Sequence, residues 1–184
     1  ALEPHFSKQT IKEHFKLYTT YMERLNDLIE GTEYMQYTME QSVPKLAANA
    51  ETAWEFKLLS ECMSHEFYFQ QFTNKEEDKQ LSPLLEEQIQ IHFESVERLK
   101  QRMVWLAQSQ FNTGWVWLML RGGQLELYFA PAGENVFHST EALETVPVLA
   151  FDASDHAYFA QYGTDMDAYV EAWWNCIDFK AAEQ

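Results

Sequence analysis

The segment from Val146 to Tyr162 constrains the fold of this 184-residue chain most strongly. It opens with an apolar, β-prone run, Val146 to Phe151, which is typical of a buried strand. Asp152 follows the run directly, and His156 comes four residues later. A carboxylate and an imidazole separated by one short turn at the end of a buried strand can share one metal ion. The alternative interpretation is that Asp152 caps a helix and His156 is a satisfied, half-buried histidine.

Two long helical patterns occupy the first part of the chain. The first runs from Ser7 to Glu30, where its first residue is a suitable N-cap and Gly31 follows as a C-terminal cap. The second runs from Leu46 to Phe72. We expect the two helices to form an antiparallel hairpin. His14 lies on or beside the apolar stripe of the first helix, and His65 belongs to the second.

The rest of the chain mixes helical and strand patterns. We predict an α+β fold in which residues 1–73 form an N-terminal helical hairpin domain, residues 74–82 a charged linker, and residues 83–184 a C-terminal α/β domain with a three-stranded antiparallel sheet. The expected elements of the second domain are helices at 84–93 and 95–108, strands at 115–120, 124–129 and 146–151, and a last helix capped by Thr164 or Asp165 and continuing through Phe179.

Charge and composition exclude several classes of function. The net charge is −16, with 29 acidic and 13 basic residues, which argues against a nucleic-acid surface. No apolar run reaches membrane-spanning length. Two cysteines do not make a disulfide framework, so a reducing compartment is the simpler interpretation. The chain starts at Ala1 without a visible signal or transit peptide, and we expect any such segment to have been removed already.

Four sequence motifs together resemble the iron/manganese superoxide dismutase family, nearly from end to end. Asp152 to Tyr158 is similar to its Asp-x-x-x-His-Ala-Tyr segment, and Ser64 to Phe69 to its Asn-His-x-Phe-Tyr-Trp helix. Asn112 to Leu118 is similar to its Gly-x-Gly-Trp-x-Trp-Leu strand start. Glu3 to His14 is similar to its opening Glu-Pro-His-Ile-Ser and the ligand histidine that follows. The resemblance implies the fold more strongly than the activity, because fold and function separate easily.

The resemblance also implies a metal site and its surroundings. A first-row metal, iron rather than manganese, would be held by three imidazoles and one carboxylate, with a position left open for solvent or substrate. The implied ligands are His14, His65, Asp152 and His156. If the chain is active, Tyr21 is the gate tyrosine, Trp115 forms a wall of the cavity, and Glu61 stands where iron-type members carry a glutamine that hydrogen-bonds the metal-bound solvent. A carboxylate there cannot donate unless protonated.

One departure from the family pattern concerns His14 itself. Between this histidine and Tyr21 the chain has one residue fewer than the family, which rotates a continuous helix by about 100°. Either His14 is in place and the following gate residues shift, or Glu13 turns inward instead. We expect the deletion to misplace His14, so that iron is substoichiometric or absent.

Other departures surround the implied metal ligands. The second histidine of the first helix is absent, and residues 17–19 occupy its region. Phe69 and Ser154 replace tryptophans, and Asp155 replaces the glutamate that crosses the interface in dimeric members. The two distinctive polar residues of the family's Tyr-x-Asn-x-Arg are lost at Tyr162 to Met166. These positions matter to catalysis more than to folding.

The sequence therefore favours a repurposed, structural member of the family. It resembles the superoxide-dismutase-like subunits of the mitochondrial small ribosomal subunit, which implies a location in the mitochondrial matrix. The expected partners are a second copy or a related chain, paired through the loop from Asp155 to Tyr162, and neighbouring ribosomal proteins, with little RNA contact and no membrane. The alternative is an active iron superoxide dismutase that converts superoxide to dioxygen and hydrogen peroxide.

Overall fold

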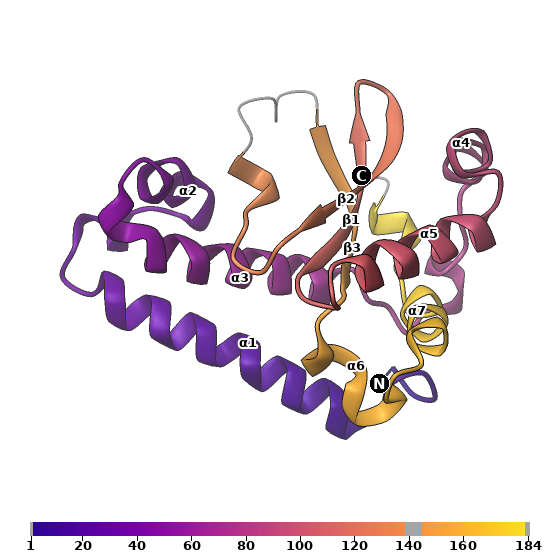
Figure 1. The fold of residues 1–184 in the computed structure, drawn as a ribbon, viewed down its shortest axis with the longest axis horizontal. Coiled ribbons are helices and arrows are strands. Elements are labelled where there is room, and N and C mark those ends of the chain that lie inside the picture. Colours follow the sequence, from indigo (N-terminus) through magenta and orange to yellow (C-terminus); the bar gives the residue numbers. More distant parts are fainter. Residues whose placement is uncertain (1, 139–144, 183–184) are drawn as a thin grey trace.

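The computed structural model describes residues 2–138 and 145–182. Two long helices, α1 (Lys8–Ile29) and α3 (Ala53–Gln70), run side by side in opposite directions along one edge of the molecule, and α2 (Met39–Ala47) lies at their connecting end (Figure 1). The sheet and the remaining helices pack against the other end of this hairpin. Among the described residues, no helix combines the length and apolarity needed to cross a bilayer.

The boundaries of α1 follow from its local sequence. The side chain of Ser7 accepts a hydrogen bond from the backbone N–H of Thr10, which satisfies one of the unpaired donors of the first turn. At the other end Gly31 takes a φ of +74°, a conformation that costs glycine little. The predicted helix from Ser7 to Glu30 is confirmed except that these two residues are its caps.

The predicted helix from Leu46 to Phe72 is wrong at its start. Leu46 belongs to α2, and a 3-10 turn, Ala50–Thr52, separates α2 from α3. The side chain of Asn49 accepts a hydrogen bond from the N–H of Glu51 and stabilises this turn. Local side-chain bonding of this kind competes with a continuous helix, and apolar periodicity alone does not detect it.

The C-terminal half is a small antiparallel sheet covered by helices. The strand order is β2-β1-β3, and β1 pairs with both neighbours in antiparallel register. The predicted fold class is confirmed. The predicted last helix is interrupted after Trp174, because Asn175 closes its final turn and a new short helix follows. The elements are α4 (Pro83–Phe93), α5 (Val96–Ser109), β1 (Trp115–Arg121), β2 (Gln124–Ala130), β3 (Thr145–Asp152), α6 (Asp155–Tyr162), α7 (Met166–Trp174) and α8 (Phe179–Ala182).

The core lies around β1, which is buried on both faces through most of its length. Trp115 and Trp117 are almost completely inaccessible, as is Trp173 of α7. Full burial of a large apolar side chain stabilises the folded state by roughly 1.5–3 kcal/mol. Trp115 and Trp117 of this central strand pack against His65 and Phe67 of α3, which fixes the sheet against that helix.

Gln71 connects the end of α3 directly to β3. Its side-chain amide donates to the carbonyl oxygen of Ala150, and its side-chain oxygen accepts from the backbone N–H of Ala150 at 3.0 Å. All four groups are buried, where such bonds are costly to break. Because His65 lies on α3 and Asp152 ends β3, this pair of hydrogen bonds fixes the distance between the two.

Candidate metal centre

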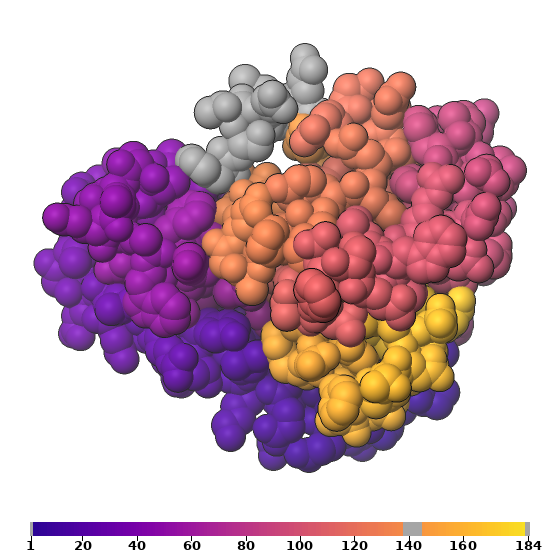
Figure 2. Space-filling model, viewed as in Figure 1, coloured from indigo at the N-terminus to yellow at the C-terminus, as the bar shows by residue number. Residues whose placement is uncertain are grey.

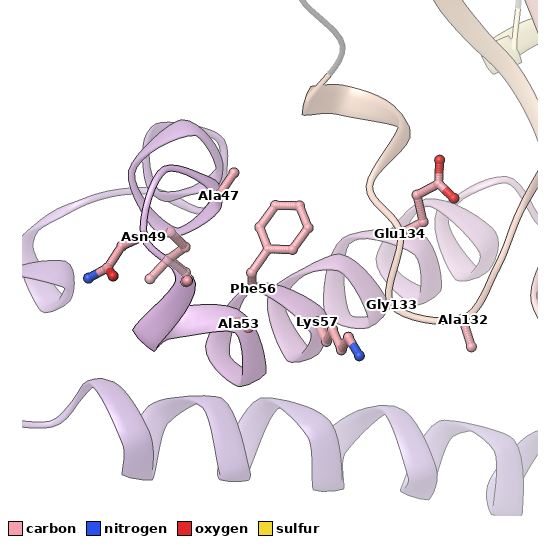
Figure 3. A pocket seen from close by; sticks show the side chains of 10 residues that line it. Ala47, Asn49, Ala53, Phe56, Lys57, Ala132, Gly133 and Glu134 are labelled. Carbon is pink, nitrogen blue, oxygen red and sulfur yellow. The ribbon is translucent and has the colours of Figure 1, made fainter.

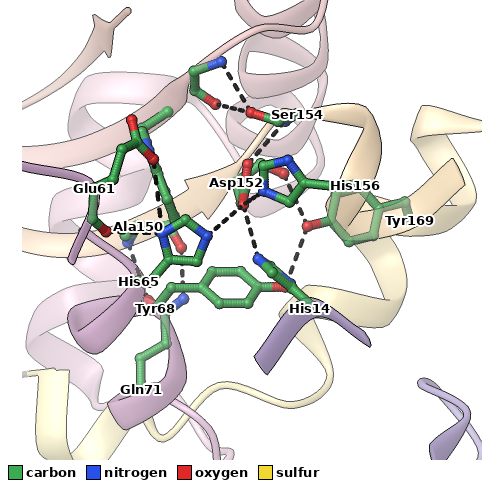
Figure 4. A network of polar contacts seen from close by, with 12 residues as sticks. His14, Glu61, His65, Tyr68, Gln71, Ala150, Asp152, Ser154, His156 and Tyr169 are labelled. Atoms are coloured by element: carbon green, nitrogen blue, oxygen red, sulfur yellow. Dashed lines mark hydrogen bonds and ion pairs between the residues drawn. The ribbon is translucent and has the colours of Figure 1, made fainter. Parts of the chain in front are cut away.

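Four side chains from four different elements meet in the interior. His14 comes from α1, His65 from α3, Asp152 from the last position of β3, and His156 from the first turn of α6 (Figure 4). One ligand atom from each side chain can be chosen so that all lie within 4.8 Å of one another. The structure therefore brings together every residue that the sequence pattern had predicted as a metal ligand.

The three imidazoles point toward one carboxylate oxygen, Asp152 Oδ2. The Nε2 atoms of His156, His14 and His65 lie 2.9, 3.0 and 3.9 Å from it, respectively. The side chains of His14, His65 and Asp152 are 1%, 0% and 0% exposed, whereas that of His156 is 32% exposed. The cluster is thus closed on three sides and open to solvent on the side of His156.

The expectation that the one-residue deletion misplaces His14 is wrong. His14 points inward, and Glu13 is exposed. Because α1 is continuous, its register is set by the inward contacts of its whole length, and the buried residues Thr10 and Leu25 share the face of His14. The deletion instead changes which residues follow on that face. Tyr18, one turn after His14, stacks on the ring of His65 with a centroid distance of 6.0 Å.

Hydrogen bonds outside the cluster orient its members. His65 Nδ1 lies 2.8 Å from the carbonyl oxygen of Glu61, so this nitrogen carries the proton and Nε2 presents its lone pair to the cluster. The second carboxylate oxygen of Asp152 accepts from the N–H of Ser154 at 2.9 Å. Its carbonyl oxygen accepts from the hydroxyl of Tyr169, which in turn contacts the hydroxyl of Tyr68 at 3.2 Å. Such partners fix ligand geometry in metal sites.

The electrostatics favour the protonation states that a metal requires at His65 and Asp152, but not at His156, whose proton a metal would have to displace. Burial lowers the pKa of His65 to about 4, so its imidazole is neutral at physiological pH. Burial alone would raise the pKa of Asp152, but the positive charge of His156 and the contact with His14 outweigh it and hold this pKa well below its usual range. Burial would lower the pKa of His156, and the Asp152 carboxylate outweighs that effect and raises it.

Two buried nitrogens test whether a metal fits here. His14 Nε2 and His65 Nε2 are inaccessible and have no partner in hydrogen-bond geometry among the described residues, although both point at the cluster. A buried polar atom without a partner is costly and calls for an explanation. A metal ion explains both nitrogens, and the set of three imidazoles and one carboxylate suits iron, manganese and other first-row ions.

Glu61 lies at the edge of the cluster, held by two donors. Its carboxylate accepts from the backbone N–H of Gly133 at 2.6 Å and from the indole N–H of Trp115 at 3.3 Å. One of its oxygens is 3.7 Å from His65 Nδ1. Burial raises its pKa, which the bond from Gly133 opposes. Both oxygens therefore act as acceptors, and neither donates toward the metal ligands.

Tyr21 and Trp115 both contact the ring of His65, with centroid distances of 5.6 and 4.9 Å. A cavity of about 540 Å³ extends from Tyr21, Glu61 and His156 outward to Lys57 and Asn112. Trp115 packs against His65 but is not among the described residues that line this cavity, so its role as a cavity wall stays a prediction. The cavity gives a small molecule access to the exposed side of the cluster.

A second hollow, of about 460 Å³, lies between α2, the start of α3 and the loop Ala132–Glu134 (Figure 3). Phe56 and Lys57 line it together with Asn49. None of the four clustered side chains reaches it. The chemistry is therefore concentrated at the first cavity.

Three residues that shape the site escaped the sequence analysis. Tyr18 could have been found, because it follows His14 at helical spacing. Tyr169 and Gly133 could not, because they come from a different helix and from a loop, and nothing local links them to the cluster. Asp155, which replaces the interface-crossing glutamate of dimeric members, accepts a hydrogen bond from the hydroxyl of Tyr158 at 3.0 Å in its own chain.

Two family models match this chain. Residues 1–73 match the model of iron/manganese superoxide dismutases, alpha-hairpin domain. Residues 81–184 match the model of iron/manganese superoxide dismutases, C-terminal domain. The second match alone covers more than half of the chain, and it contains Asp152 and His156, whereas the first contains His14 and His65.

Proposed function

Because this chain belongs to the iron/manganese superoxide dismutase family, we propose that it binds one iron or manganese ion and dismutates superoxide. The observation that supports this most directly is the position of His14, whose Nε2 lies 3.0 Å from Asp152 Oδ2. The sequence had favoured a structural protein partly because His14 was expected to be displaced. With that argument removed, the complete ligand set favours the enzyme.

Some residues of the site would hold the ion, and others border the path by which the substrate enters. A bound iron or manganese ion supplies the one-electron exchange that converts superoxide to dioxygen and hydrogen peroxide. His65, neutral because of its lowered pKa, keeps a lone pair available without losing a proton. Asp152 supplies a negative charge that offsets that of the cation. Tyr21 and His156 border the cavity through which a small anion arrives.

Iron is the metal that we propose first. Glu61 occupies the place at which the iron-type members of the family carry their glutamine, on the helix of His65. Manganese uses the same nitrogen and oxygen ligands, so ligand type alone does not separate the two metals.

Metal analysis and turnover test this proposal together. Protein refolded with ferrous iron and then desalted should retain close to one ion per chain and consume superoxide. His65→Ala should lose the ion, while the control Glu13→Ala, on the exposed side of α1, should keep it. A wild-type chain that retains no metal after loading would contradict the proposal outright.

A second candidate is a structural subunit, and the surroundings of the cluster support it. Both oxygens of Glu61 are occupied by Gly133 and Trp115, which leaves no donor on that side of the site. The net charge of −16 opposes the approach of an anion. The subunit would bind basic neighbouring proteins in the mitochondrial small ribosomal subunit, with little RNA contact. Co-sedimentation with that subunit, lost at high salt and unchanged by His65→Ala, would favour this function over catalysis.

For either function we propose a dimer through the face of α6 and a location in the mitochondrial matrix. The exposed ring of Phe159 lies on α6, three residues after His156. The partner is a second copy or a related superoxide-dismutase-like chain. Sedimentation of Phe159→Asp against the wild type tests the interface, and a monomeric wild type would contradict it. Microscopy of the tagged protein in cells tests the location.

A further inference from the structure

The outer face of α1 carries its charges in two separate blocks. Lys8, Lys12 and Lys16 lie in the first half of the helix, and all three are exposed. Glu23, Asp27 and the C-cap Glu30 lie in the second half, also exposed. At about 100° per residue the six positions fall within an arc of about 100°, on the side opposite His14. This charged face is defined by these six residues.

Helix stability does not account for this arrangement. Anionic side chains stabilise the N-terminus of a helix and cationic ones the C-terminus, yet the first turn of α1 has no acid and the last turn no base. Lysines four residues apart also repel each other, as do Glu23 and Asp27. The order of charges is therefore the reverse of the one that the isolated helix would favour.

The lysines of this face also lack partners within the chain. Among the described residues, every lysine and arginine beyond Lys57 forms an ion pair. Lys8, Lys12 and Lys16 form none, although acidic residues outnumber basic ones by 29 to 13. Exposed lysines need no ion pair in water, and Arg24, Lys45 and Lys57 also form none among the described residues. Three lysines in one block nevertheless leave this face able to bind an acidic partner.

The spacing of the charges identifies a second copy of the chain as that partner. Lys16 and Glu23 are equally distant from the point between Thr19 and Thr20, and so are Lys12 and Asp27. Lys8 and Glu30 deviate from this rule by only one residue. When two copies of α1 lie antiparallel across a two-fold axis at that point, each lysine therefore meets the matching acid of the other copy. The opposed helix dipoles favour the same orientation.

The middle of the helix permits such an approach. The hydroxyls of Thr19 and Thr20 both donate to the carbonyl oxygen of Lys16 at 2.9 Å, so they need no further partner. Both side chains are short. Figure 1 shows no element on the outer side of α1, and in Figure 2 the indigo and violet N-terminal region forms the lower edge of the molecule. We infer that α1 is an interface at which two copies of this chain pair antiparallel through the charged face.

The ionic strength decides whether the attraction between the lysines and acids of the two α1 helices exceeds the repulsion between two chains that each carry a net charge of −16. At 0.1 M salt the screening length is about 10 Å, which weakens the repulsion between distant charges more than the attraction between touching pairs. At 1 M salt the screening length of about 3 Å also weakens the pairs. The association should therefore be strongest near 0.1 M and weaker at both extremes.

Charge reversal tests the interface by sedimentation equilibrium near 0.1 M salt. The variant K12E/K16E leaves Lys8 as the one positive charge among the six residues of the face, and its mass should be half that of the wild type. E23K/D27K makes the face positive and should also halve the mass. An equimolar mixture of the two variants should restore the full mass, because each lysine again meets an acid. If the chain also pairs through α6, the masses of the wild type and of every variant double together. The twofold ratio between the wild type and the charge-reversed variants therefore stays the same.

A matched control and a combined variant complete the test. R24E/K45E changes the net charge as much as K12E/K16E but lies off the charged face, so its mass should equal that of the wild type. K12E/K16E/E23K/D27K restores complementarity within one chain and should recover the full mass. Equal masses for the wild type and K12E/K16E, or a mixture that fails to reassociate, would overturn the inference. Metal content and turnover play no part, so failure of the proposed function is a separate result.

Discussion

The two sides of the metal centre differ in how they are stabilised. On the side of Asp152 the aspartate itself is held by hydrogen bonds: Ser154 and Tyr169 donate to it, and Tyr68 contacts the hydroxyl of Tyr169. On the side of Glu61 a charged side chain replaces the amide expected from the resemblance, and a loop residue, Gly133, holds it. The comparison teaches that the residues proposed to hold a metal and the residue proposed to tune it can be changed separately, because their supporting hydrogen bonds come from different elements.

Removing Asp152 should have the largest effect. Asp152→Ala removes the one carboxylate of the cluster, deprives His156 of its acceptor and leaves the N–H of Ser154 without its bond, so metal binding should be lost. The free energy of unfolding of the metal-free protein should fall by about 2–3 kcal/mol, measured by urea denaturation. The control is Asp167→Ala on the surface of α7, which should change stability by less than about 0.5 kcal/mol. Retention of the ion in Asp152→Ala would contradict the role of Asp152 as a metal ligand.

Acid should destabilise the metal-free protein through His65. The folded state takes up this proton only near pH 4, whereas the unfolded chain does so at the ordinary pKa of 6.5. The unfolded state therefore binds more protons between these values, and stability falls as pH falls from 6.5 to 4. The limiting slope is about 1.4 kcal/mol per pH unit. His156 acts at higher pH, because its raised pKa contributes stability that is fully present below 6.5 and is lost as pH rises through the folded-state pKa.

Denaturation curves at several pH values check this prediction. His65→Asn removes the titrating ring, so its stability should vary less steeply over the same range. A wild-type curve that is flat or rises toward acid would contradict the assignment of a neutral, buried His65.

Gly133→Ala should test the loop on the side of Glu61. A Cβ there would lie 2.9 Å from Lys57 Cγ, and φ is +80°. We expect a loss of about 1–2 kcal/mol and a displaced loop that no longer donates to Glu61. Gly122→Ala is the matched control, because its φ of +54° is also positive but a Cβ there meets nothing within 4 Å. If both variants lose equal stability, contact with Lys57 contributes nothing.

Glu61→Gln should have the smallest effect on stability. An amide has only one acceptor oxygen, so one of the bonds from Gly133 and Trp115 is lost, at a cost of about 1 kcal/mol. The glutamine side chain supplies an N–H donor at this position and removes a negative charge beside His65. Superoxide turnover by the iron-loaded variant should therefore exceed that of the wild type. A lower turnover would show that the carboxylate itself takes part.

The order of helices and strands could be predicted from the sequence because apolar periodicity is local. The strand that ends at Asp152 and the caps of α1 are examples, since neighbours in sequence determine them. Asp152 and His156 were noticed from their four-residue spacing, whereas His14 and His65 were found only through a resemblance, because they lie on elements far from that segment in the chain. The break before α3 was missed because the side chain of Asn49 competes with the helix, which periodicity does not reveal.

The register of α1 was decided only by the tertiary structure. A deletion of one residue rotates everything beyond it relative to everything before it, and the sequence cannot say which half moves. Packing against α3 and α6 keeps His14 inward, and the change falls on Tyr18 instead. The bond between Gly133 and Glu61 likewise joins residues 72 positions apart. Such contacts depend on how whole elements pack, which no local pattern in the sequence records.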